Sequence, residues 1–139
     1  MAKEVRELEH EEFPLAEKVW THYRGQKADP ARERIFGIFI DGTLAATARC
    51  TRHPGGLEMD CVFTLDEHRG HGYAREVVQM LLEECGSETI YIHSTLPLIE
   101  FYGSLGFEPI PEARLPESIR ERFIFCFGGE MAGCNVAPP

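Results

Sequence analysis

The sequence predicts a mixed α/β (α+β) domain with a mostly antiparallel sheet flanked by helices, and three observations lead to that class. Apolar runs separated by tight-turn residues occupy the first half of the chain. An apolar stripe at helical spacing follows directly after them. The chain has 139 residues, of which 43% are hydrophobic, and this suits one domain with one core. We expect that domain over residues 1–127 and a C-terminal tail over residues 128–139.

The chain is predicted to begin with a strand and a helix. Glu4–Leu8 is expected as a short strand and Glu11–Tyr23 as an amphipathic helix. Pro14 suits the first turn of this helix, because the N–H that proline lacks would have no helical acceptor there. Gly25 is typical of the residue that follows a helix.

An antiparallel meander of three strands is predicted next. Ile35–Ile40 and Leu44–Cys50 are apolar and are joined by Asp41-Gly42. That dipeptide tolerates the positive φ angles of a tight hairpin. Leu57–Leu65 follows after a proline-glycine turn as the third strand.

The second half of the chain changes from the period of strands to the period of a helix. Six apolar residues recur at i, i+3, i+4, i+7, i+8 and i+11, which indicates an amphipathic helix. They are Ala74, Val77, Val78, Leu81, Leu82 and Cys85. The remaining elements are expected to be a strand at Thr89–His93, a helix at Pro97–Leu105, a brief strand at Phe107–Ile110 and a last strand at Arg122–Phe127.

Composition argues against several classes of partner. The formal net charge of −9 disfavours nucleic acid, because an acidic surface repels phosphate backbones. No apolar run reaches the ~20 residues that span a bilayer, so no membrane partner is expected. The charged segment Met1–His10 does not resemble a secretory signal, and we expect a cytoplasmic protein. The cysteines and histidines lack ligand spacing, so no metal site is predicted, and His53 is expected at the surface or in packing.

A glycine-rich turn before the amphipathic helix is the candidate ligand site. Gly70 and Gly72 let a ligand approach the backbone closely, because they carry no Cβ. The first N–H groups of the helix have no intrahelical partner and favour an anion such as a phosphate. Arg69, His71 and Arg75 add positive charge at this point. From glycine and charge alone, an ordinary solvated helix is an equally good interpretation.

Two common phosphate motifs do not fit this turn. A dinucleotide fingerprint needs a third glycine where Arg75 stands, and a P-loop needs G-K-[ST]. What remains is a pyrophosphate site that follows an antiparallel meander.

Two segments resemble the landmarks of the GNAT superfamily of N-acetyltransferases. The hexapeptide RGHGYA at Arg69–Ala74 is similar to the superfamily signature Q/R-x-x-G-x-G/A. The heptapeptide FYGSLGF at Phe101–Phe107 resembles the second landmark, an aromatic-Tyr-x-x-x-Gly-Phe segment. The two landmarks occur in the expected order, separated by a helix and a strand. The resemblance implies the GNAT fold, in which a splayed pair of parallel strands forms the cofactor cleft.

The resemblance implies a binding site for acetyl-coenzyme A. In the superfamily, the amides of the signature loop bind the pyrophosphate, and the pantetheine arm lies between the splayed strands. The matching residues are Val62, Phe63, Thr64, Leu65, Arg69, Gly70, His71, Gly72, Tyr73, Ala74, Ser94, Thr95 and Tyr102. Thr95 stands where family members often have an asparagine.

The resemblance also implies direct transfer of the acetyl group to a primary amine. Tyr102 matches the tyrosine that protonates the leaving thiolate, and it also fits a core aromatic beside Phe101 and Phe107. Glu58 is the best match for a general base on the splayed strand. Asp60 is expected on the same face, because strand side chains alternate. Either acid also fits a cation-binding or solvent-facing role.

Two functions are compatible with the expected fold. An acetyl-CoA-dependent N-acetyltransferase is favoured by the candidate acid and bases, and a non-catalytic acetyl-CoA-binding sensor or interaction module is the alternative. The acceptor is expected to be a small-molecule or protein amine, whose identity the sequence does not give. Dimerisation is common in the superfamily. The last predicted strand fits either a homodimer or the core of a monomer through its apolar residues Phe123, Ile124, Phe125 and Phe127.

Overall fold

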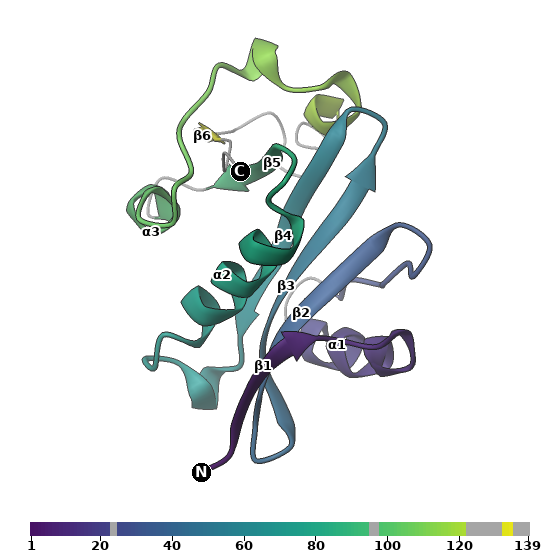
Figure 1. The fold of residues 1–139 in the computed structure, drawn as a ribbon, viewed down its shortest axis with the longest axis vertical. Coiled ribbons are helices and arrows are strands. Elements are labelled where there is room, and N and C mark those ends of the chain that lie inside the picture. The colour runs from purple at the N-terminus through teal and green to yellow at the C-terminus, as the bar shows by residue number, and fades with distance from the viewer. Residues whose placement is uncertain (23–24, 95–97, 122–131, 135–139) are drawn as a thin grey trace. The chain divides into compact units, whose positions relative to one another are not determined.

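The computed structural model describes residues 1–22, 25–94, 98–121 and 132–134 (Figure 1). The strands are β1 (Lys3–Glu7), β2 (Glu33–Ile40), β3 (Thr43–His53), β4 (Gly56–Thr64), β5 (Ile90–Ser94) and β6 (Ala132–Cys134). The α-helices are α1 (Phe13–Trp20), α2 (Tyr73–Cys85) and α3 (Ile99–Gly103). The 3-10 helices are η1 (His10–Glu12), η2 (Asp66–His68) and η4 (Glu112–Arg114), and residues 117–121 are also helical.

The strands form a mixed sheet in the order β1-β2-β3-β4-β5-β6. The pairs β1–β2, β2–β3 and β5–β6 are antiparallel, and the pair β4–β5 is parallel. This confirms the predicted mixed class with a mostly antiparallel sheet. The chain folds as two compact units, Met1–Thr51 with Asp60–Glu84 and Arg52–Met59 with Cys85–Pro139. Strand β4 runs from the second unit into the first, and the single domain over residues 1–127 stays a prediction.

The β2–β3 hairpin forms where the sequence predicts it. Asp41 and Gly42 have φ angles of 50° and 83°, so both central residues of the turn lie in the left-handed region. The Asp41 carboxylate also accepts a hydrogen bond from the N–H of Ala2 at 2.8 Å. This bond ties the turn to the start of β1, which pairs with β2 along its whole length.

The core of the first unit lies between α1 and the meander strands. The buried side of α1 consists of Phe13, Ala16, Val19 and Trp20. These side chains form one apolar cluster with Leu8, Ile35, Phe39, Leu44 and Cys61. Side chains alternate along a strand, so Phe36 and Ile38 of β2 point to the opposite face. Both are fully buried, as are Val77, Val78 and Leu81 of α2, and Figure 1 shows α1 and α2 flanking these strands.

The second unit contains the parallel pair. Strands β4 and β5 pair from Leu57↔Ile90 to Met59↔Ile92, which confirms a parallel pair at this point of the fold. Their splaying beyond these residues stays a prediction. On its other side β5 pairs with β6, which lies within the predicted tail of residues 128–139. A small apolar cluster of Leu115 and Ile119 packs against Tyr91 of β5.

Two predicted elements differ from the structure, and a third cannot be compared. The helix predicted over Glu11–Tyr23 is divided into η1 and α1. The regular helix begins at Phe13, with Pro14 in its first turn, and Tyr23 lies outside the described residues. Residues 107–110 form only a single bridge at Pro109, because a proline has no N–H to extend a ladder. The predicted strand Arg122–Phe127 lies outside the described residues.

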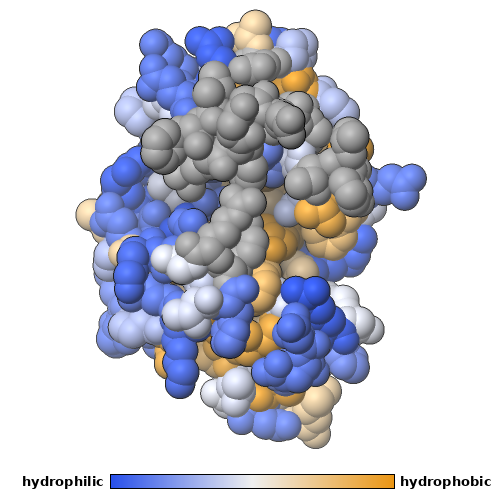
Figure 2. Space-filling view, turned by 180° about the vertical axis from the view of Figure 1, so that it is seen from behind, coloured by the Kyte–Doolittle hydropathy of each residue, from blue (hydrophilic) through white to orange (hydrophobic). Residues whose placement is uncertain are grey.

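The surface agrees with a polar composition. The face in Figure 2 is mostly hydrophilic outside the residues drawn in grey, with hydrophobic residues gathered in a central strip. Charged residues make up 27% of the sequence. Within the described ranges, no helix has the length and apolarity to cross a membrane.

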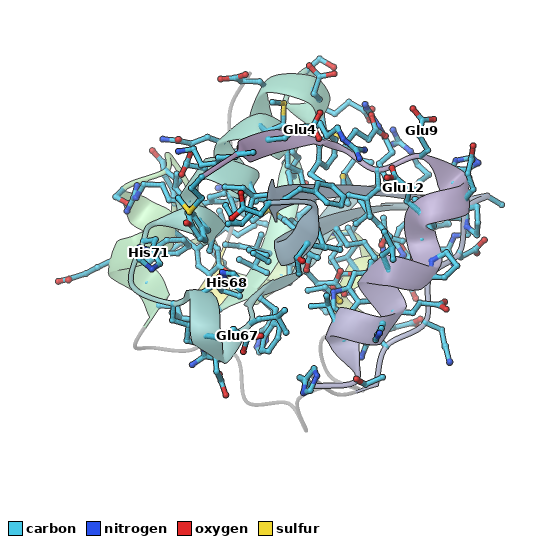
Figure 3. The ribbon with its side chains drawn as sticks, turned by 90° about the horizontal axis from the view of Figure 1, so that it is seen from below. Glu4, Glu9, Glu12, Glu67, His68 and His71 are labelled. Atoms are coloured by element: carbon cyan, nitrogen blue, oxygen red, sulfur yellow. The ribbon has the colours of Figure 1, made fainter. Side chains whose placement is uncertain are left out.

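An ion pair joins β1 to the start of the first helical segment. Two Arg6 nitrogens donate to the two carboxylate oxygens of Glu12 at 2.7 and 2.8 Å. Glu12 also accepts the N–H of Glu9 at 2.8 Å, and Figure 3 shows both glutamates at this turn. The hydrogen bonds from Arg6 and then from the Glu9 N–H lower the pKa of Glu12 to about 2. The Arg6 guanidinium lies 4.3 Å from the centre of the Phe39 ring, which adds a cation–π contact.

Replacing Glu12 with glutamine should lower the free energy of unfolding by about 1 kcal/mol near neutral pH. Because its pKa falls from 4.5 to about 2 on folding, Glu12 stabilises the fold above pH 4.5, and this contribution disappears as the pH falls to about 2. Wild type and Glu12→Gln should therefore converge in acid. Urea unfolding at a series of pH values measures the difference. Glu11→Gln removes the same charge from an exposed neighbour, so an equal loss in that control would contradict the assignment to the Arg6 pair.

Candidate active site

The signature loop, Arg69–Ala74, joins η2 to α2 with two glycines in the left-handed region. Gly70 has a φ of 86° and Gly72 a φ of 77°, a conformation that side-chain-bearing residues rarely adopt. A Cβ built on either glycine would meet no atom within 4 Å, so the space over the loop is open. The first helical hydrogen bond runs from the Glu76 N–H to the Gly72 carbonyl at 3.2 Å. The N–H groups before Glu76 therefore have no acceptor within the helix.

The side chains around this loop are aromatic or charged, with charges of both signs. The His71 ring stacks on Tyr73 with centroids 5.1 Å apart, and the His68 ring is 6.3 Å from the same tyrosine. Figure 3 shows Glu67, His68 and His71 on the turn that leads into α2. Arg69 bonds the Thr64 carbonyl at 3.3 Å and pairs with Asp66 at 3.2 Å. Tyr73 is buried and anchors the loop to the unit, while both glycines are exposed.

A cleft of about 510 Å³ lies in the first unit beside the signature loop. Its lining residues are His22, Phe63, Leu65, Asp66, Glu67 and Arg69. Phe63 and Leu65 also pack against the α1 cluster, and the Arg69 guanidinium lies 5.7 Å from the centre of the Phe63 ring. Three predicted cofactor residues, Phe63, Leu65 and Arg69, thus line one concave surface.

Strand β4 is irregular at Cys61. The φ of Cys61 is 51°, which is uncommon for a residue with a side chain and typical of a bulged strand. A buried hydrogen-bond chain fixes this conformation. The Trp20 indole N–H donates to the Thr47 hydroxyl at 2.9 Å, and that hydroxyl donates to the Cys61 carbonyl at 2.8 Å. The irregularity lies directly before the predicted cofactor residues Val62–Leu65.

Glu58, the predicted general base, is buried beside a histidine. Only 3% of the residue is exposed, and its Oε1 lies 2.9 Å from Nε2 of His53, which is itself 9% exposed. The two side chains come from opposite sides of the β3–β4 turn within the second unit. The expectation that His53 is a surface or packing residue missed this hydrogen bond, because histidine spacing alone carries no sign of it.

Asp60, the alternative base, is bound to a buried arginine. The Nε and Nη2 atoms of Arg49 donate to the two Asp60 carboxylate oxygens at 2.8 and 2.7 Å. Burial opposes the charge of Arg49, but the hydrogen bonds that it donates to Asp60 outweigh this effect, so the pKa of Arg49 lies above its usual value. The guanidinium also bonds the Lys27 carbonyl and lies 5.0 Å from the centre of the Trp20 ring. Asp60 therefore has a structural role in the first unit.

The remaining predicted residues belong to the second unit. Tyr102 lies on α3, is 8% exposed, and packs edge-to-face with Phe101 at 5.1 Å and Phe107 at 5.8 Å. Ser94 ends β5, is 1% exposed, and pairs in register with Ala132. Thr95 lies outside the described residues. No group of three or more histidine, cysteine, aspartate or glutamate side chains within the described ranges is arranged to hold a metal ion.

Comparison with known proteins identifies the class. Residues 2–107 match the acetyltransferase (GNAT) family. The match covers more than half of the sequence and includes both landmarks, so the chain belongs to the GNAT family of acetyltransferases. A comparison with curated protein sequences gave no match.

Several solved structures share the fold. A protein of Novosphingobium aromaticivorans assigned to the GNAT family is 27% identical, with a TM-score of 0.66 over 75% of this chain and 51% of that one. The Escherichia coli ribosomal-protein-S18-alanine N-acetyltransferase is 18% identical, with a TM-score of 0.67 over 79% of this chain and 80% of that one. N-acetylglutamate synthase of Neisseria gonorrhoeae, crystallised with coenzyme A and N-acetyl-glutamate, is 14% identical, with a TM-score of 0.74. The match covers 94% of this chain and 34% of the synthase.

Replacing Thr47 with valine should lower the free energy of unfolding by about 1–3 kcal/mol, because the Trp20 N–H and the Cys61 carbonyl would lose a buried partner. Thr47→Ser keeps the hydroxyl and should retain most of that stability. Urea unfolding of both variants measures the difference. If serine and valine are equally destabilising, packing of the methyl group rather than the hydrogen-bond chain is what matters at this position.

Proposed function

We propose that this protein is an acetyl-CoA-dependent N-acetyltransferase that moves an acetyl group to a primary amine by direct attack. The observation that carries the proposal is the signature loop, whose two left-handed glycines leave open space over the first N–H groups of α2. Such a helix start binds phosphate through backbone amides. The gonococcal relative was crystallised with coenzyme A, which supports the same ligand here.

The binding residues are assigned to the cofactor by their place in the fold and in the family motif. The loop amides of Arg69–Ala74 would hold the pyrophosphate. The residues Val62–Leu65, which follow the irregularity at Cys61, would pair with the pantetheine arm, together with Ser94 and Thr95. The loop has room for this ligand, since a Cβ built on either glycine would meet no atom within 4 Å.

Two side chains are assigned to proton transfer. Tyr102 would donate a proton to the leaving thiolate, and Glu58 would accept the proton that the amine loses. Asp60 is not assigned this role, because a permanently charged guanidinium occupies both of its oxygens. Glu58 is assigned the role of base because it matches the position of the family's glutamate on β4 and its carboxylate contacts a histidine.

Two observations, the acceptors of similar proteins and the net charge, support an amine as the class of acceptor. The Escherichia coli relative acts on the alanine of a ribosomal protein, and the gonococcal relative makes N-acetylglutamate, so both acceptors are amines. A net charge of −9 favours an acceptor that carries a positive charge before it reacts. A cytoplasmic location and a homodimer remain predictions, and size-exclusion chromatography with light scattering tests the second.

Replacing Gly72 with glutamate should abolish acetyl-CoA binding, because the new carboxylate would stand where the pyrophosphate is expected. Isothermal titration calorimetry measures the dissociation constant, and a loss of at least about tenfold is expected for a clash of like charges in a phosphate site. Gly42→Glu is the matched control. It introduces the same side chain at a φ of 83°, with equally open space, in the β2–β3 turn. Equal weakening in both variants would point to strain rather than to the ligand site, and no binding to wild type would refute the proposal.

Replacing Tyr102 with phenylalanine should lower the turnover number by about 10²-fold or more and leave the dissociation constant of acetyl-CoA nearly unchanged. The ring contacts with Phe101 and Phe107 do not involve the hydroxyl, so the fold should be preserved. Steady-state kinetics with an amine found by screening, combined with calorimetry, measures both quantities. Unchanged turnover would show that Tyr102 is a core aromatic. A wild type that binds acetyl-CoA and acetylates no amine would favour the sensor alternative.

A further inference from the structure

We propose that His53 is a positioning residue for the base, and that the Glu58–His53 pair takes up the proton lost by the acceptor amine. This inference rests on the proposed function and extends it to a residue outside both family landmarks. It begins from a contact of 2.9 Å between His53 Nε2 and Glu58 Oε1.

The burial of the pair argues that the contact is needed. The side chains of Glu58 and His53 are 4% and 9% exposed. An ionised carboxylate buried without a partner is strongly unfavourable, so a hydrogen-bond donor must face it. When Glu58 is ionised, His53 Nε2 carries the proton and donates. This bond orients the carboxylate and fixes the tautomer of the ring.

The face of the parallel strands that carries Glu58 also carries a tyrosine and a small apolar cluster. Tyr91 of β5 is the register partner of Glu58, so both side chains lie on the same face of the parallel pair. Tyr91 packs in turn against the cluster of Leu115 and Ile119, which helps to exclude water from this face. Arg52, next to His53 in the sequence, is exposed and forms an ion pair with Glu88.

An imidazole differs from a guanidinium as a partner, because an imidazole nitrogen can both hold and release a proton. The contrast is Asp60, whose partner Arg49 stays charged at all accessible pH values and cannot share a proton. Of the two acids proposed as bases on β4, Glu58 is therefore the one bonded to a group that can share a proton.

The proton step balances in atoms and charge. An ammonium N–H bond breaks and an O–H bond forms on the Glu58 carboxylate, which leaves a neutral amine with a free electron pair. The amine nitrogen then bonds to the carbonyl carbon of the thioester as the C–S bond breaks. Tyr102 donates its hydroxyl proton to the leaving thiolate. The tyrosine then takes the second proton from the nitrogen, which restores the hydroxyl. The proton held by the Glu58–His53 pair is finally released to water.

The experiment uses the full chain with two substitutions at His53. His53→Leu removes the hydrogen bond, and His53→Gln retains an N–H donor in place of Nε2 but cannot titrate. We expect His53→Leu to lower the turnover number by about tenfold or more and His53→Gln to restore it to within about threefold of wild type. The acidic limb of the pH profile of kcat/KM should move in His53→Gln, because the pair then holds its proton on Glu58 alone. The dissociation constant of acetyl-CoA should stay within about twofold in both.

Arg52→Gln is the matched control, because it changes the adjacent, exposed residue of β3 and should leave both the rate and the pH profile unchanged. Wild-type turnover in His53→Leu overturns the inference. So does a glutamine variant as slow as the leucine variant with an unmoved pH profile, since that result indicates packing alone. A wild type that transfers no acetyl group to any amine overturns the proposed function itself, and this outcome is distinct from active wild type with insensitive His53 variants.

Discussion

The left-handed conformation of Cys61 is the constraint on which the candidate site depends. A residue with a Cβ avoids this region, so neighbouring bonds must hold it there. The Thr47 hydroxyl does so, because it donates to the Cys61 carbonyl while it accepts from the Trp20 indole. Strand β4 is thereby committed to an irregular course just before Val62–Leu65. One buried hydroxyl thus links the core helix α1, the meander and the segment proposed to contact the cofactor.

Two acids that are only two positions apart on β4 have partners of different chemistry. Asp60 meets a buried arginine that already bonds a backbone carbonyl and an indole ring, so its carboxylate completes a fixed network. Glu58 contacts an imidazole, which can hold or release a proton. The two acids therefore differ in their partners, although their side chains differ by only one methylene group, and only Glu58 is proposed for proton transfer.

The fold was largely predictable because its signals are local. Asp41-Gly42 allowed the hairpin, and the apolar stripe from Ala74 to Cys85 gave α2, since both depend on short-range geometry. The boundaries of α1 were less accurate, because the interaction of Arg6 with Glu12 shapes the segment before the regular helix. The strand predicted at Phe107–Ile110 is only a single bridge at Pro109. A proline within a short apolar run argues against a strand, because it has no N–H for the ladder.

The sequence by itself determined the class of the protein, because the two landmarks are short contiguous motifs whose function lies in backbone geometry. The role of Gly70 and Gly72 could be predicted without a structure, since a loop that binds phosphate through its amides needs residues without a Cβ. Only the tertiary structure decided the partners of the acids. His53 meets Glu58 across a turn, Arg49 meets Asp60 across 11 positions, and Trp20 reaches Thr47 across 27. Such pairs depend on strand register and on burial, and no local pattern of residues encodes either.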